Sequence, residues 1–78
     1  MKKIRGIEVK KDVAFGKPVV AGTRIAVEFI LELLSSGWTT EQILTSYPHL
    51  KKKDILSALT YSKEVVKQWK GYPLRVAS

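Results

Sequence analysis

The feature that most constrains this sequence is a helix-start signal followed, nine positions later, by a proline. A Thr-Thr-Glu-Gln capping box has Thr39 as its N-cap and Gln42 at the third helical position. Pro48 disfavours helical geometry in the residue before it, so the helix that begins here ends by Tyr47. The sequence therefore predicts one short helix between Thr39 and Tyr47.

Two longer helical patterns flank this short helix. Before it, a helix from Ala26 repeats apolar residues at helical spacing and stops at Gly37, a left-handed cap. After a turn at 47–50, a third helix starts near 51–53 and runs to about Trp69. The stripe of the third helix that is expected to face the core consists of Ile55, Leu59, Ser62, Val66 and Trp69. Trp38 and Tyr47, which flank the short helix, are expected to anchor the core.

The N-terminal region, 3–25, has the alternating pattern of β structure. Charged residues separate its odd-numbered apolar positions, and this predicts two half-buried strands joined by a turn at 10–12. The odd-numbered apolar residues are Ile7, Val9, Val13 and Phe15. Gly16-Lys17-Pro18 is expected to break the second strand, and Val19-Val20 to continue in an extended conformation.

These patterns together predict a mostly α fold, a tri-helical helix-turn-helix with a short N-terminal β element. The 78 residues leave room for a single domain, 1–78. Within it we expect a β/turn region at 3–25, a helix-turn-helix core at 26–69 and a tail at 70–78.

Composition excludes several classes of protein. With no cysteine, the chain is not a disulfide-stapled secreted scaffold. Its longest apolar run, Phe29–Leu31, is far short of a membrane span, and no apolar stretch follows the basic N-terminus as in a signal peptide. One histidine and seven scattered acids are poor material for catalysis. We therefore expect a cytoplasmic protein that is not an enzyme and binds no metal or cofactor.

The positive charge is concentrated in two places. The formal net charge is +7, and the excess cations lie in 1–11 and in the triplet Lys51–Lys53. Lysines at the start of a helix add to the positive end of its dipole, which favours binding of an anion such as a phosphate. Residues one to three turns further along one face are expected to meet base edges. The candidate DNA-binding residues are Lys51, Lys52, Lys53, Ser57, Thr60, Lys63, Lys2, Lys3 and Arg5. The alternative is a solvated face with no ligand.

Several strings of the sequence, in order and at the right spacing, resemble the domain-of-unknown-function family 433. The resemblance runs from about residue 7 to about residue 66 and includes Gly22-Thr23-Arg24-Ile25 and Tyr47-Pro48-His49-Leu50. It implies a homeodomain-like helix-turn-helix with a short β element in front. Some members resemble antitoxins encoded beside PIN-like ribonuclease toxins. Ala26 stands where the family often has proline, and Lys51 where it often has serine or threonine.

Two functions follow as hypotheses. The first is a DNA-binding antitoxin-type regulator of a toxin–antitoxin module, with duplex DNA and a PIN-like ribonuclease as partners. The second is a protein-interaction or dimerisation module that does not bind DNA. A homodimer is expected in either case, because the first helix is apolar on nearly all sides. The tail is expected to contact a partner chain through Tyr72, Leu74 and Val76.

Overall fold

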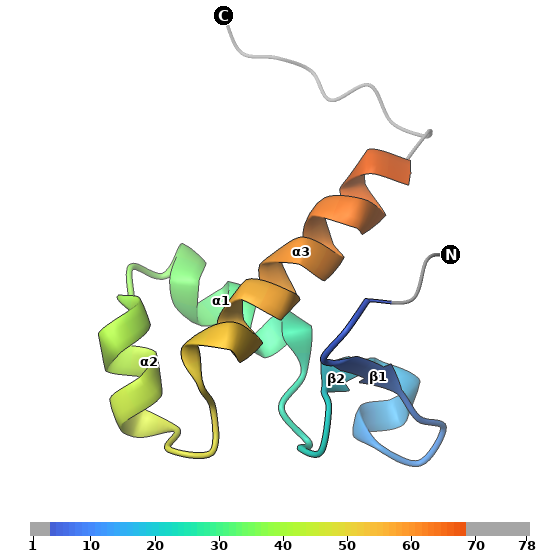
Figure 1. Cartoon of the computed structure of the whole chain (residues 1–78), viewed down its shortest axis with the longest axis horizontal. Helices are drawn as coiled ribbons and strands as arrows, with labels where there is room; N and C mark the ends of the chain where they lie inside the picture. Colours follow the sequence, from blue (N-terminus) through green and yellow to red (C-terminus); the bar gives the residue numbers. More distant parts are fainter. Residues whose placement is uncertain (1–3, 69–78) are drawn as a thin grey trace, which may run out of the picture.

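The chain folds into a two-stranded antiparallel sheet followed by three helices (Figure 1). The structure is a computed structural model that describes residues 4–68. The elements are β1 (Ile7–Val9), the 3-10 turn η1 (Ala14–Gly16), β2 (Pro18–Val20), α1 (Val27–Ser35), α2 (Thr40–Ser46) and α3 (Lys52–Gln68). The prediction of a mostly helical fold with a short N-terminal β element is confirmed.

The second strand lies later in the chain than predicted. β1 pairs with β2, with Ile7 opposite Val20 and Val9 opposite Pro18, so the prediction of a strand at 13–15 is wrong. Ala14 and Phe15 have φ of 49° and 57°, and these left-handed conformations end any extended segment. The side chain of Phe15 is 99% exposed. Pro18 starts the strand instead of breaking it, because the first position of a strand tolerates a proline.

A hydroxyl group closes the turn between β2 and α1. The Thr23 hydroxyl donates to the carbonyl of Val20 at 2.9 Å and accepts from the N–H of Ile25 at 3.0 Å. The N–H of Val20 donates to the carbonyl of Ile25 at 2.9 Å. These bonds satisfy the backbone of a sharp turn and set the direction in which α1 starts.

The predicted ends of α1 and α2 are confirmed. Gly37 has φ of 98°, and the N–H of Trp38 donates to the carbonyl of Leu33 at 3.1 Å, as in a Schellman motif. The capping box is complete, because Gln42 N–H donates to the Thr39 hydroxyl at 3.1 Å and Thr39 N–H donates to the Gln42 side-chain oxygen at 2.7 Å. α2 ends at Ser46, before Pro48.

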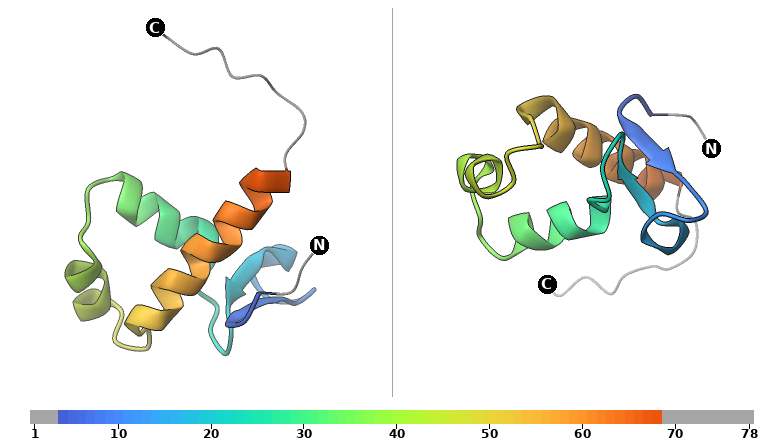
Figure 2. Two further views of the ribbon diagram at one scale, coloured as in Figure 1. Left: turned by 45° about the horizontal axis from the view of Figure 1, so that its top comes forward. Right: turned by 90° about the horizontal axis from the view of Figure 1, so that it is seen from below.

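The core lies where the three helices and the sheet meet. Figure 2 places α2 at one side of the α1–α3 pair and the sheet at the other. Every element except the 3-10 turn contributes side chains, and so does the turn between α2 and α3. The core residues are Ile7, Val20, Val27, Ile30, Leu33, Ile43, Leu50, Ile55 and Ala58. Among the described residues, no helix is both long enough and apolar enough to cross a membrane.

The core-facing stripe predicted for α3 is wrong at Leu59 and Val66, and its last member, Trp69, lies outside the described residues. Ile55 is buried and Ser62 is half-buried, but Leu59 is 42% exposed and Val66 is 71% exposed. α3 crosses α1 and projects past it (Figure 1). Its two buried residues, Ile55 and Ala58, therefore lie in its first half, and in the second half Tyr61 packs against the core.

Candidate nucleic-acid interface

The lysine triplet stands at the start of α3, after the turn that follows α2. This turn is held by Leu50, which is 4% exposed and whose N–H donates to the carbonyl of Tyr47 at 2.9 Å. Lys51, Lys52 and Lys53 are all exposed. The buried anchor therefore fixes the backbone while the three ammonium groups remain in solvent, at the positive end of the helix dipole.

The first turn of α3 supplies its own cap. The N–H of Lys51 donates to a carboxylate oxygen of Asp54 at 2.8 Å. This bond is one half of a capping box; the other half is missing, because the Lys51 side chain cannot accept a hydrogen bond from the first turn as Ser or Thr would. Asp54 is half-buried, so its charge offsets part of the lysine triplet from within the turn.

The three candidate base-reading residues of α3 do not share one surface. Thr60 and Lys63 are exposed; the Thr60 hydroxyl donates to the carbonyl of Leu56 at 2.9 Å, and the ammonium of Lys63 lies 3.8 Å from Glu64. Ser57 is half-buried against the N-terminal segment. A Cβ built on Gly6 would lie 2.8 Å from the Ser57 hydroxyl oxygen. Ser57 is therefore less accessible than Thr60, because the backbone at Gly6 lies against it.

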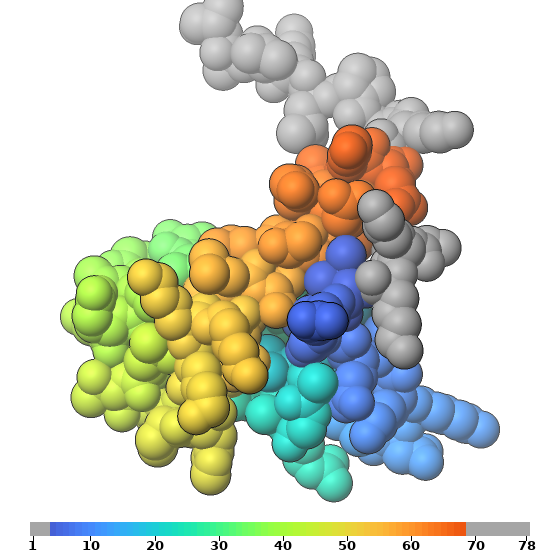
Figure 3. Space-filling model, in the orientation of Figure 1, coloured from blue at the N-terminus to red at the C-terminus, as the bar shows by residue number. Residues whose placement is uncertain are grey.

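The basic N-terminal segment reaches the same part of the molecule. Arg5 is exposed and directly precedes Gly6, which lies against α3. Figure 3 shows the first described residues and the start of α3 on one face. Lys2 and Lys3 lie outside the described residues. Arg5, one of the first described residues, therefore lies on the same face of the molecule as the start of α3.

The outward face of α3 also carries two leucines. Leu56 is 54% exposed and Leu59 is 42% exposed. Sequence reasoning missed this surface, because it placed Leu59 in the core. Base reading in the major groove relies on Arg, Lys, Asn and Gln, and beside these leucines α3 carries only lysines of that set, Lys52, Lys53, Lys63 and Lys67. The arrangement therefore suits contact with phosphates better than discrimination between bases.

Charge is segregated between the elements, which sequence reasoning also missed. Residues 25–50 contain Glu28, Glu32 and Glu41 but no Lys or Arg, and this signal is legible in the sequence. Lys17, from the turn before β2, donates to a carboxylate oxygen of Glu28 at 2.7 Å. This hydrogen bond and the lysine charge lower the pKa of Glu28. The helices α1 and α2 therefore repel a polyanion that the start of α3 attracts.

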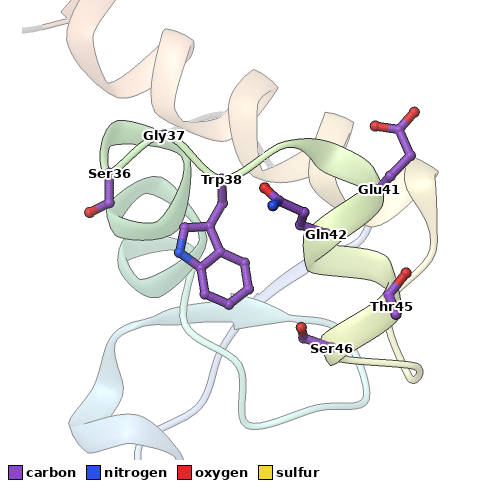
Figure 4. A pocket seen from close by; sticks show the side chains of 7 residues that line it. All are labelled: Ser36, Gly37, Trp38, Glu41, Gln42, Thr45 and Ser46. Atoms are coloured by element: carbon purple, nitrogen blue, oxygen red, sulfur yellow. The ribbon is translucent and has the colours of Figure 1, made fainter.

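An open pocket lies between the end of α1 and α2, and its lining residues are Ser36, Gly37, Trp38, Glu41, Gln42, Thr45 and Ser46 (Figure 4). Trp38 is 37% exposed beside this pocket, so its predicted role as a core anchor is wrong. Tyr47 does pack against the core, and its ring meets Phe29 edge-on with 5.4 Å between centroids. Among the described residues, no group of three or more His, Cys, Asp or Glu side chains is placed to hold a metal ion.

Comparisons with known proteins agree with this fold. The model of the family described as "Protein of unknown function (DUF433)" matches residues 7–62. The chain is also similar to the crystal structure of a DUF433 member protein from Anabaena variabilis ATCC 29413, with 25% sequence identity and a TM-score of 0.75. The match covers 81% of this chain and 62% of that one, so this chain spans less than two thirds of its relative's length. No curated protein matches the chain.

Proposed function

The chain belongs to the DUF433 family, whose function is unknown. For this member we propose the function of a DNA-binding regulator of the antitoxin type. The observation that carries the proposal is the exposed lysine triplet at the start of α3. It follows a short helix and a tight turn, the order in which a helix-turn-helix protein presents its recognition helix to DNA. The proposed role is one of binding, without catalysis, in the cytoplasm.

Phosphate contacts account for most of the proposed affinity. Lys51, Lys52 and Lys53, together with the N-terminal cations, would neutralise about four to six phosphates per protomer. Thr60 and Lys63 lie further along the exposed face of α3 and would make the contacts with base edges, which contribute sequence discrimination. The carboxylates of α1 and α2 favour an approach of DNA from the α3 side.

The proposed partner is a toxin-like protein of the PIN-like ribonuclease class, and the regulator would act as a homodimer. The apolar tail residues Tyr72, Leu74 and Val76, which lie outside the described residues, are the proposed contacts with a partner chain. We expect sedimentation at tens of micromolar to give a dimer. A clean monomer at that concentration would remove the dimer from the proposal.

A salt titration of binding to duplex DNA tests the proposed function. We expect the affinity to fall with salt at a log–log slope of roughly −4 to −5, and Lys52→Ala with Lys53→Ala to flatten that slope by about two. A matched control is Lys10→Ala with Lys11→Ala, which removes the same charge from the turn after β1. The control should flatten the slope less, because Lys10 and Lys11 follow β1 instead of standing at the start of α3, and Lys10 already lies 3.5 Å from Glu8.

Two results would contradict DNA binding through α3. One is the absence of measurable binding at low salt. The other is an equal loss in both double variants, which would show that binding follows net charge and not the lysine triplet.

The exposed leucines of α3 favour a second function, a protein-interaction module without DNA binding. Leu56 and Leu59 place apolar area where a DNA-reading helix carries polar side chains. Leu56→Lys separates the two functions. It should weaken association with a protein partner if this face is an interface, and it should strengthen binding to DNA if the face lies against phosphates.

A further inference from the structure

An apolar groove runs between α1 and the second half of α3. Its apolar lining consists of Pro18, Val27, Leu31, Tyr61, Val65 and Val66. Val65 is 36% exposed and Val66 is 71% exposed, so both valines stand open to water at the wall of the groove. The part of α3 that forms this wall, Tyr61–Gln68, contains no buried residue. Nothing within residues 4–68 covers the groove.

We propose that the C-terminal segment of the same chain, Trp69–Ser78, folds back along α3 and fills this groove. The inference goes beyond the proposed function, because it concerns the protein without DNA or a partner. It makes the segment an internal ligand that a partner protein would have to displace.

The segment begins in the right place and is long enough. The last described residue of α3, Gln68, follows Val66 by two positions, so the segment starts beside the groove. Its ten residues can span up to about 35 Å when extended. The helix from Tyr61 to Gln68 is about 10 Å long. Gly71 supplies a residue that readily ends a helix and reverses the chain.

The composition of the segment matches the groove in polarity. Tyr72, Leu74 and Val76 alternate with other residues, so an extended chain presents all three on one side. Arg75 then lies on the opposite side of the extended chain, facing solvent, so the apolar side chains alone face the groove.

The same chain is a better occupant than a second copy of the protein. A tether of a few residues holds the segment at a high effective concentration, on the order of millimolar, whereas a second copy must associate from solution. We therefore assign the groove to the chain's own tail.

A spin label tests this assignment cleanly, because the chain contains no cysteine. Ser78→Cys creates a single attachment point at the end of the full-length protein. We expect the label to broaden the NMR signals of Leu31 and Val65, which line the groove. The signals of Glu41 and Thr45, on α2 at the other side of the molecule, should stay sharp.

A pair of matched variants of α3 shows whether the groove is responsible. Val65→Lys, made in the labelled protein, should restore the signal of Leu31, because it places a charge in the apolar wall of the groove. Leu56→Lys makes the same change on the outward face of α3 and should leave the broadening as it was. An unchanged helical circular dichroism spectrum confirms that both variants fold.

Two outcomes would overturn the proposal. The first is the absence of broadening at Leu31 and Val65. The second is broadening that appears only when labelled protein is mixed with isotope-enriched, unlabelled protein, since that would assign the groove to the tail of a second copy. Neither outcome bears on DNA binding, which is read from the salt titration of the lysine variants.

Discussion

The two halves of α3 belong to one continuous helix but meet different surroundings. The first half, Lys52–Thr60, contains Ile55 and Ala58, which are 2% and 0% exposed. In the second half, Tyr61–Gln68, Tyr61 still packs against the core, but no residue is buried, and Val66 is 71% exposed. The first half is therefore held by packing, whereas the second half leaves the valines Val65 and Val66 in contact with solvent. Helical periodicity alone does not distinguish these two situations.

The largest expected effect contrasts a core residue with an exposed one. Ile55→Ala leaves a cavity where β1, α1 and α3 meet and should cost about 2–5 kcal/mol of unfolding free energy. Val66→Ala should cost about 0.5 kcal/mol, because its side chain is largely in solvent. Urea denaturation of both variants gives the two values. Similar losses would show that the second half of α3 is packed as tightly as the first.

A smaller effect is expected where the N-terminal segment meets the first half of α3. Gly6 and Gly16 have φ of 86° and 80°, so alanine at either position is strained by about 1–2 kcal/mol. A Cβ at Gly6 would also approach the Ser57 hydroxyl oxygen to 2.8 Å, whereas one at Gly16 meets nothing within 4 Å. We expect Gly6→Ala to lower the melting temperature more than Gly16→Ala.

Removing the hydroxyl identifies the origin of that difference. Ser57→Ala in the Gly6→Ala background should recover part of the additional loss, because it removes the atom that the new Cβ meets. If the two glycine variants have the same melting temperature, the N-terminal segment does not contact the first half of α3. The two halves of α3 would then differ less in their packing.

The smallest effect concerns the ion pair beside the second half of α3. The Lys17 ammonium lowers the pKa of Glu28 below its ordinary value of 4.5, first through their hydrogen bond and then through its charge. Lys17→Gln should raise the pKa of Glu28, as measured by NMR titration. A lowered carboxyl pKa stabilises the fold above the ordinary value and loses this contribution as the pH falls through the lowered one. Because both side chains are exposed, melting near neutral pH should barely change.

Local chemistry was predictable from the sequence, and packing geometry was not. The capping box at Thr39, the left-handed Gly37 and the stop before Pro48 each depend on a few neighbouring residues, and each is confirmed. The strand predicted at 13–15 failed, because alternation gives no information on the positive φ of Phe15. The apolar stripe of α3 failed, because the angle at which this helix crosses α1 is a property of the whole fold.

The candidate site likewise combines features that were predictable from the sequence with features that depend on packing. The exposure of Lys51–Lys53 needed only the charge run and the helix start, and it was predictable. Whether Ser57 faces outward depends on where the N-terminal segment lies, which is a contact between residues about fifty positions apart. The segregation of charge needed no structure, since it required only a count of cations between positions 25 and 50.

That segregation gives the molecule an electric polarity. Within residues 4–68, the lysines and arginines lie between positions 5 and 24 and between positions 51 and 67, while the charged residues of α1 and α2 are all carboxylates. A body with this distribution experiences a torque in the field of any polyanion before the two surfaces touch. It would arrive already turned, with α1 and α2 trailing. The orientation is then set before the surfaces meet. Added salt would therefore lower the rate of encounter as well as the affinity of the final complex.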